Sequence, residues 1–384
     1  MAAHPADPAV PRTALVLTGG GARAAYQVGV LLAIAKLSPK RKQNPFPILC
    51  GTSAGAINAT GLACLADDFG KATMVLASIW KNMHARDIYR ADALGIGATG
   101  ARWLSSFALG WLIKHPPRSL LDNAPLRRLL SQHLDFTGID RAIQKGALHA
   151  VSVAASGYDT GENIAFFQGH PDAEPWKRTQ RHGIRTDITV DHLMASSAIP
   201  FIFPAIRLNR EYFGDGSMRQ LAPISPAIHL GAERILVVGA GRAREHQERR
   251  TSEGYPPLAQ IAGHTLASIF LDGLAVDIER LQRINHTLSK IPEHVRAEAG
   301  ISLRPIETLV IAPSERLDRI AAEHARALPT PVKIMLTGLG AMNRSGGALT
   351  SYLLFEKPYT RRLIDLGYAD TMARSEEIGR FLNF

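Results

Sequence analysis

The sequence has few cysteines, few aromatic residues and no long apolar run. Of its 384 residues two are cysteine, and aromatic residues make up 7%. Cys50 and Cys64 both lie in apolar surroundings, which indicates small buried side chains and argues against a disulfide framework or a cysteine metal site. No uninterrupted apolar segment reaches the roughly 20 residues of a membrane-spanning helix. We therefore expect a cytoplasmic protein, peripheral at a membrane at most, with no metal ion or other cofactor.

Basic residues outnumber acidic ones, 44 to 34, which gives a formal net charge of +10. This excess favours an anionic partner, either a membrane surface or nucleic acid, unless it serves only solubility. Nucleic-acid-binding proteins interleave basic and aromatic residues, and this sequence has no such motif. We therefore expect peripheral contact with anionic membranes and no nucleic-acid partner.

Ser53 stands at the centre of the motif Gly51-Thr52-Ser53-Ala54-Gly55. Apolar residues at 46–50 predict a buried strand before the motif, and small apolar residues at 54–62 predict a helix after it. Gly-x-Ser-x-Gly between a strand and a helix is typical of a nucleophile elbow, where Gly51 and Gly55 leave room for the sharp bend. The alternative is a serine that only caps the helix.

A glycine-rich turn, Gly19-Gly20-Gly21-Ala22-Arg23, lies between a predicted strand at 13–18 and a predicted apolar helix at 28–37. Consecutive backbone N–H groups in such a turn bind anions, as an oxyanion hole or as a phosphate cradle. The spacing fits neither common nucleotide-binding motif, so the phosphate interpretation is the weaker one. Two successive strand–turn–helix units place this turn and Ser53 at the same edge of a parallel sheet.

Asp215 lies between two glycines at the end of a predicted hairpin at 207–214. This position suits a carboxylate that projects into a site, and it suits an ordinary turn residue equally well. Other strands are predicted at 147–156, 163–168, 234–238 and 307–312. Other helices are predicted at 69–90, 125–133, 190–197, 223–230 and 261–288, from a Ser314 cap to residue 325, and at 349–365 and 372–381, the last two interrupted by Pro358 and Gly367.

Composition suggests how the chain is divided. We expect a disordered leader at 1–12, a catalytic domain at 13–240 and a charged linker at 241–257. A mostly helical region at 258–384 should pack on the core. Within the catalytic domain, the apolar stretch at 91–119 is a packed helical insertion, a mobile cover over the site, or a surface that enters lipid.

Four blocks in this order resemble those of patatin-like phospholipases, and the resemblance covers residues 13–238. The blocks are Gly19-Gly20-Gly21-Ala22-Arg23, Gly51-Thr52-Ser53-Ala54-Gly55, Ala195-Ser196-Ser197-Ala198-Ile199-Pro200 and Asp215-Gly216-Ser217. The resemblance implies a three-layer α/β/α sandwich around a mainly parallel sheet, with a helical insertion and a helical C-terminal region.

The resemblance also implies a serine acyl hydrolase acting on phospholipid or lysophospholipid through an acyl-enzyme. Ser53 would be the nucleophile, Asp215 its base, and the N–H groups around Gly20, Gly21 and Arg23 the oxyanion hole. An aspartate of ordinary pKa, about 3.9, is a weak base, so burial would have to raise its pKa.

Two positions depart from the family pattern. Ala24 stands where glycine usually follows the arginine of the first block, and Ser217 stands where glycine or alanine usually closes the last block. Both changes are small, so we expect the site geometry to survive them. The side chain of Arg23 would either hold the turn or bind a phospholipid head group.

Two other interpretations stay open at this point. One is an α/β-hydrolase esterase with a Ser-His-Asp triad, for which His229, His264 and His286 follow the acid. The other is a non-catalytic lipid- or nucleotide-binding module that uses the glycine turn to hold an anion. The sequence itself sets neither the acyl chain nor the oligomeric state.

Overall fold

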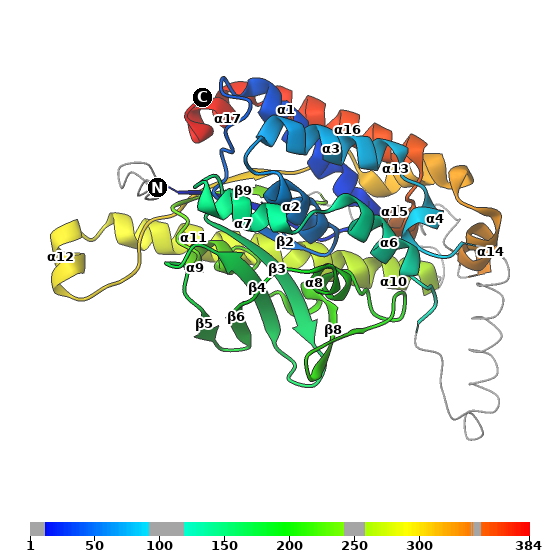
Figure 1. The fold of residues 1–384 in the computed structure, drawn as a ribbon, viewed down its shortest axis with the longest axis horizontal. Helices are drawn as coiled ribbons and strands as arrows, with labels where there is room; N and C mark the ends of the chain where they lie inside the picture. The colour runs from blue at the N-terminus through cyan, green and yellow to red at the C-terminus, as the bar shows by residue number, and fades with distance from the viewer. Residues whose placement is uncertain (1–11, 92–118, 242–257, 339, 341–346) are drawn as a thin grey trace, which may run out of the picture.

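A computed structural model describes residues 12–91, 119–241, 258–338, 340 and 347–384. The strands in these ranges form one ten-stranded mixed sheet. Five neighbouring strands run parallel in the order β10-β9-β1-β2-β3 (Figure 1). They are β1 (Thr13–Leu17), β2 (Ile48–Thr52), β3 (Ala150–Gly157), β9 (Arg234–Val238) and β10 (Glu307–Ile311).

Beyond β3 the sheet changes direction. Strand β4 pairs with β3 antiparallel and with β6 parallel, and β5 pairs with β6 antiparallel. A separate hairpin of β7 and β8 joins the sheet through β8, which is antiparallel to the end of β3. These strands are β4 (Asn163–Gly169), β5 (Trp176–Arg178), β6 (Arg181–Arg185), β7 (Ile206–Leu208) and β8 (Glu211–Asp215).

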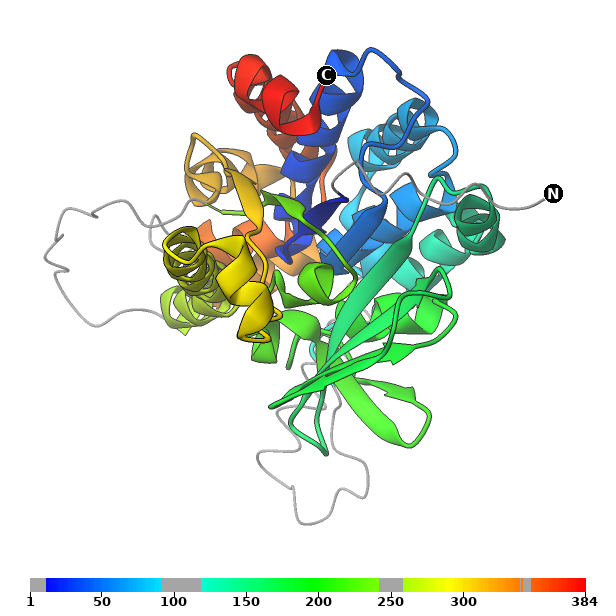
Figure 2. The same ribbon diagram turned by 90° about the vertical axis from the view of Figure 1, so that its left-hand side faces the viewer.

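Helices cover both faces of the parallel strands, with α1, α3 and α16 on one side and α9 and α11 on the other (Figures 1 and 2). Strand β1 shows why both faces are buried. Leu15 and Leu17 join the larger apolar core, whereas Ala14 and Val16 join a second core on the opposite face. A strand buried on both faces is expected to be continuously apolar. The expected three-layer α/β/α fold is confirmed.

The remaining elements follow the chain around this sheet. The α-helices are α1 (Ala25–Leu37), α2 (Ala54–Cys64), α3 (Phe69–Asn82), α4 (Ala85–Ile88), α6 (Ala124–His133), α7 (Thr137–Gln144), α8 (Val190–Ser196), α9 (Ser225–His229), α10 (Leu258–Ala267), α11 (Gly273–Ser289), α12 (Glu293–Glu298), α13 (Leu317–His324), α14 (Thr330–Gly338), α15 (Gly347–Leu353), α16 (Lys357–Met372) and α17 (Ser375–Leu382). Short segments are the 3₁₀ turns η1 (Gly21–Ala24), η2 (Gly216–Arg219) and η4 (Ala325–Ala327) and the π-helical η3 (Ser268–Asp272).

Three predicted helices differ from the observed ones. The helix expected at 69–90 divides into α3 and α4, because the backbone of His84 is extended and caps α4. Ser314 does not cap α13; its N–H and hydroxyl both donate to Asp370. The interruptions expected at Pro358 and Gly367 do not occur, because both residues lie within α16. Pro358 stands in the first turn, where a missing N–H costs nothing, and Gly367 lies against the carbonyl of Tyr26.

The proposed division of the chain lies partly outside the described residues, which begin at 12 and omit 92–118 and 242–257. The insertion and the linker therefore stay predictions. The C-terminal region contributes strand β10 to the sheet and helix α16 to the layer that contains α1 (Figure 1).

One helix, Gln260–Ser289, is long and apolar enough to cross a membrane by length and composition. Polar residues interrupt this stretch, so it contains no uninterrupted apolar run of that length. Phe270, Asp277 and Leu281 of this helix are buried against the rest of the protein. Core helices of soluble proteins that pass the same test are mostly buried, whereas 24% of the apolar window of this helix is buried; a single such helix is weak evidence for a membrane span.

Candidate active site

Ser53 lies on a sharp turn between β2 and α2, with φ 55° and ψ −130°. Positive φ strains a residue that has a side chain, and such strain is typical of a nucleophile elbow. Gly51 and Gly55 are required on either side. A Cβ on Gly51 would lie 2.5 Å from Cα of Ala56, and one on Gly55 would lie 2.3 Å from the carbonyl oxygen of Leu17.

The register of the sheet brings Asp215 to the same place. Thr52, the last residue of β2, pairs with Ala154 of β3. The next residue of β3, Ala155, pairs with Asp215 at the end of β8. Ser53 and Asp215 therefore flank the same end of β3, although they are far apart in the sequence. The side chain of Asp215 is buried.

Burial raises the pKa of Asp215 to about 6, and hydrogen bonding to the Ser53 hydroxyl and to the Ser217 N–H and hydroxyl limits this rise. Oδ1 accepts from the Ser217 N–H at 2.9 Å. Among the described residues, the buried Oδ2 has no hydrogen-bond partner. The Ser53 hydroxyl is near enough to affect the pKa of the carboxyl, and catalytic hydrogen bonds are often long or poorly aligned without substrate.

The glycine turn follows β1, and the pairing of Leu17 with Gly51 places it beside the elbow. The N–H of Arg23 donates to the Gly20 carbonyl at 3.1 Å, which argues against this N–H as an oxyanion donor. Within the described chain, the N–H groups of Gly20 and Gly21 have no acceptor. These two groups are donors that the turn leaves available.

The side chain of Arg23 holds the turn against α15. Its Nε donates to Oγ of Ser351 at 2.7 Å, and its guanidinium lies 4.1 Å from the ring centre of Tyr352. A Cβ on Gly21 would lie 2.3 Å from the carbonyl oxygen of Tyr352, so the turn fits closely against this residue. Arg23 itself is only 5% exposed. This arrangement favours the structural role over head-group binding.

An apolar pocket reaches Ser53 and has a cavity volume of about 50 Å³. Two of the lining residues, Leu76 and Leu134, lie beside Gly61. Each has a side-chain atom within 4 Å of where a Cβ on Gly61 would stand. Gly61 is eight residues beyond Ser53, or roughly 12 Å along the helix axis. The lining residues are Gly21, Ser53, Ala54, Ile57, Leu76, Ile79, Trp80, Met83, Ile88, Leu126, Leu129, Leu130, His133, Leu134, Ser197, Ile199, Phe203, Tyr352 and Phe355.

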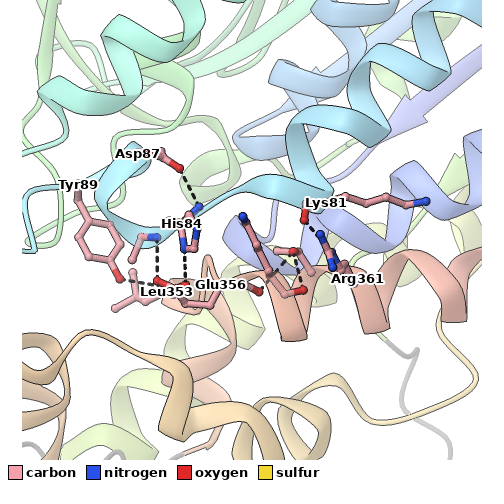
Figure 3. Close-up of polar contacts among 10 residues, drawn as sticks. Lys81, His84, Asp87, Tyr89, Leu353, Glu356 and Arg361 are labelled. Carbon is pink, nitrogen blue, oxygen red and sulfur yellow. Dashed lines mark hydrogen bonds and ion pairs between the residues drawn. The ribbon is translucent and has the colours of Figure 1, made fainter.

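Polar contacts join the start of α4 to the connection between α15 and α16, as Figure 3 shows, and the neighbouring residues Met83, Ile88 and Phe355 line the pocket. Glu356 accepts from the Ala85 N–H at 3.1 Å, and its other oxygen lies 2.8 Å from Nδ1 of His84. The hydroxyl of Tyr89 donates to the Leu353 carbonyl at 2.9 Å. These contacts fix the start of α4 against the connection between α15 and α16.

A buried amide behind the elbow was not singled out from the sequence. Asn58 of α2 donates to the carbonyl of Ala24 at 3.2 Å and to Gln27 at 2.9 Å, and it accepts from the Trp80 indole at 2.8 Å. Gln27 in turn donates to the carbonyl of Thr18. The network ties the elbow helix to the glycine turn, and its only sequence signal was a polar residue in an apolar helix.

Block three of the sequence pattern supplies two serines next to the elbow. Oγ of Ser196 accepts from the Ser53 N–H at 2.8 Å, which supports the strained turn. Ser197 lines the pocket, and its buried hydroxyl has no partner among the described residues. On the other side of the elbow, the Thr52 hydroxyl donates to Gln220 at 3.0 Å.

The three histidines considered for a triad lie elsewhere. His229 stacks on Trp176, with ring centres 4.9 Å apart. His264 and His286 are exposed on α10 and α11. In the described part of the chain, none of the three has a hydrogen bond to Ser53 or Asp215.

Two solved structures have a low similarity to this chain. VipD from Legionella pneumophila has a TM-score of 0.33 at 13% identity, covering 92% of this chain and 67% of that one. Human GIVD cytosolic phospholipase A2, solved with methyl gamma-linolenyl fluorophosphonate, has a TM-score of 0.43 at 12% identity, covering 97% and 59%. Neither score reaches 0.5.

The curated proteins include a nearer relative in sequence. A cGAMP-activated phospholipase from Pseudomonas aeruginosa is 31% identical over 214 residues, which are 54% of this chain and 53% of the relative. The chain thus matches about half the length of that protein. The model of the patatin-like phospholipase family matches residues 15–228, more than half of the chain and all four sequence blocks. The chain therefore belongs to the patatin-like phospholipase family.

Proposed function

We propose that this protein is a lipid acyl hydrolase of the phospholipase A type, with Ser53 as nucleophile and Asp215 as base. One observation supports the proposal above all others: a strained serine that lines an apolar pocket and a buried carboxylate of raised pKa flank the same end of β3. The phospholipase name of the Pseudomonas relative supports the same class of substrate.

In the acylation step, Oγ of Ser53 attacks the ester carbonyl carbon while its proton passes to Asp215. The electron pair of the carbonyl moves to its oxygen, and the N–H groups of Gly20 and Gly21 stabilise the negative charge. The bond to the alcohol then breaks, and the departing alcohol takes the proton from Asp215. Ser53 is left as an ester of the fatty acid.

Deacylation repeats these events with water. Asp215 removes a proton from a water molecule, whose oxygen attacks the acyl carbon. The second tetrahedral oxyanion uses the same two N–H groups. When it collapses, the bond to Ser53 breaks and the proton returns to the serine oxygen. A carboxylate with a pKa of about 6 can both accept and return the proton, because it is ionised at neutral pH and more basic than an ordinary aspartate.

The pocket indicates which part of the substrate lies buried. Its lining is almost wholly apolar and offers few partners for a head group, so the fatty acyl chain would enter it. The polar part of a phospholipid or lysophospholipid would stay at the mouth. We further propose that the enzyme works in the cytoplasm at an anionic membrane surface, consistent with its net charge of +10.

An alkyl fluorophosphonate tests the nucleophile directly. The proposal predicts a covalent adduct on Ser53, no labelling of Ser53→Ala, and full labelling of Ser289→Ala, which changes an exposed serine on α11. Profiling a mixed lipid extract should show free fatty acid released by the wild type and none by Ser53→Ala. Absence of labelling and of fatty acid release by folded wild type would instead support the non-catalytic binding module.

A further inference from the structure

The residue that departs from the family pattern at the end of the fourth block lies against the proposed base. We propose that the hydroxyl of Ser217 is a positioning group that donates to the Asp215 carboxylate and holds it between the elbow and the glycine turn. The inference rests on the proposed function of Asp215 as base. It adds a donor that glycine or alanine at this position cannot supply.

The backbone brings Ser217 to Asp215 first. Asp215 is the N-cap of η2, and its Oδ1 accepts from the Ser217 N–H at 2.9 Å. Gly216 between them must be glycine, because a Cβ there would lie 2.2 Å from the carbonyl oxygen of Ala154. The side chain of Ser217 thus starts from a fixed backbone beside the carboxylate.

The side chain of Ser217 points toward the glycine turn. Its Oγ lies 2.6 Å from where a Cβ on Gly19 would stand, so the two residues are in close contact. The ring of Phe270 reaches 2.7 Å from the same point, because the π-helical η3 carries it there. Ser217 is only 5% exposed. The hydroxyl is therefore confined between the acid and the turn that would hold the oxyanion.

The hydroxyl and the carboxylate are both left unpaired. Among the described residues, Oγ of Ser217 and Oδ2 of Asp215 are buried and make no hydrogen bond, to each other or to another group. A buried hydroxyl without a partner costs free energy, and a hydrogen bond to a carboxylate recovers more of it than one to a neutral group. The Ser217 hydroxyl is also one of the groups that lower the pKa of Asp215.

No ionised side chain in the described part of the chain is among the groups that shift the pKa of Asp215. Tyr158, which follows β3, has a raised pKa. The main cause is its burial, and the second is the negative charge of Asp215. Arg219, at the end of η2, points to Gly161 instead. The charged and titratable residues of α8 and the glycine turn have other partners: Asp191 pairs with Arg127, His192 contacts Thr189, and Arg23 donates to Ser351. Removal of the Ser217 hydroxyl should therefore act on Asp215 without a competing charge.

The test measures the rate of fluorophosphonate labelling as a function of pH, where the Ser53 oxygen displaces fluoride and Asp215 takes the proton. In Ser217→Ala, the acidic limb of the profile should move to higher pH by about half a unit to one unit. At pH values well above this limb, the labelling rate of Ser217→Ala should stay within about threefold of the wild-type rate. Ser217→Thr keeps the hydroxyl and should restore the wild-type limb.

Ser156→Ala is the matched control. Ser156 lies on β3 in the same cluster, but its hydroxyl donates to the Gly216 carbonyl at 3.4 Å and not to Asp215. The acidic limb of the Ser156→Ala labelling profile should lie at the same pH as that of wild type. If Ser217→Ala does not fold, Ser217→Gly replaces it, since glycine is common at this position in the family.

An unchanged limb in folded Ser217→Ala overturns the inference, and so does a uniform loss of rate at every pH. Ser53→Ala separates this failure from failure of the proposed function. If labelling persists in Ser53→Ala, the nucleophile is wrong. If labelling depends on Ser53 but its pH profile ignores Ser217, the hydrolase stands and only the role of Ser217 is rejected.

Discussion

Arg23 and Ser351 are 328 residues apart in the sequence, and Nε of the arginine donates to Oγ of the serine at 2.7 Å. Arg23 belongs to the glycine turn, whereas Ser351 lies beyond the segment that matches the family model. A buried guanidinium needs its hydrogen bonds, because its charge cannot be solvated by water. The C-terminal region therefore takes part in holding the turn.

The first prediction concerns this contact. Ser351→Ala should lower the fluorophosphonate labelling rate about tenfold, because the loss of a hydrogen bond to a charged group costs roughly 1.5–3 kcal/mol and frees the turn. Ser289→Ala removes an exposed serine hydroxyl in the same C-terminal region and should leave the rate unchanged. A wild-type rate in folded Ser351→Ala would show that the turn keeps its geometry without this contact.

The second prediction links activity and stability at Asp215. Burial raises its pKa to about 6, so the folded state favours the protonated form. The folded protein should therefore lose roughly 3 kcal/mol of stability as pH rises from about 4 to about 6, where this carboxyl ionises only at a cost. Asp215→Asn removes that cost and should abolish labelling while it stabilises the protein at neutral pH.

Thermal unfolding of both proteins across this pH range measures the effect. The melting temperature of Asp215→Asn minus that of wild type should increase between pH 4 and pH 7, since other groups titrate equally in both. A difference that stays constant with pH would contradict a raised pKa for Asp215. A more stable and inactive variant would be typical of a site that trades stability for function.

Much of the site could be predicted because its signals are local. Gly51 and Gly55 around Ser53 predict a sharp turn between a strand and a helix, and Ser53 lies on such a turn with a positive φ. The strand expected at 13–18 agrees with β1, whereas β2 begins two residues after the strand expected at 46–50 and ends at Thr52. The sheet register that brings Asp215 next to Ser53 is a long-range property, and the order of four sequence blocks indicated it only through a family resemblance.

What the sequence could not give depends on contacts with no local pattern. Asn58 looks like an ordinary polar residue in an apolar helix, yet it has three hydrogen-bond partners around the elbow. The extended backbone of His84, which divides α3 from α4, is stabilised by Glu356 from the other end of the chain. Pairings of this kind have no periodicity from which to read them.

The third prediction concerns the length of the acyl chain. Leu134 is half-buried in the pocket lining, and it lies beside Gly61, roughly 12 Å from Ser53 along α2. Leu134→Phe should fill this part of the pocket. We expect kcat/KM for a long-chain ester to fall about tenfold or more, with little change for a butyryl ester.

The same substitution at Leu382 of α17 is a matched control, because this half-buried leucine does not line the pocket. Leu382→Phe should leave the ratio of long-chain to short-chain activity unchanged. Equal losses for both esters in Leu134→Phe would indicate a general packing defect rather than an acyl site.

The fourth prediction concerns the membrane surface. Phe201 is 75% exposed and has φ 64°, an unfavourable conformation for an aromatic residue. The Leu120 N–H holds it there by donating to its carbonyl at 2.7 Å. Because Ile199 and Phe203 on either side line the pocket, an exposed ring at this point suits insertion into lipid beside the mouth.

Wild type should co-sediment weakly with anionic vesicles and less so as salt is raised, because a charge of +10 is screened at high ionic strength. Phe201→Ala should weaken this binding severalfold and leave hydrolysis of a soluble butyryl ester unchanged. Met74→Ala, which removes another exposed apolar side chain, on α3, should bind like wild type. Equal binding to neutral and anionic vesicles would contradict the electrostatic part of the prediction, and wild-type binding by Phe201→Ala would contradict the insertion of this ring.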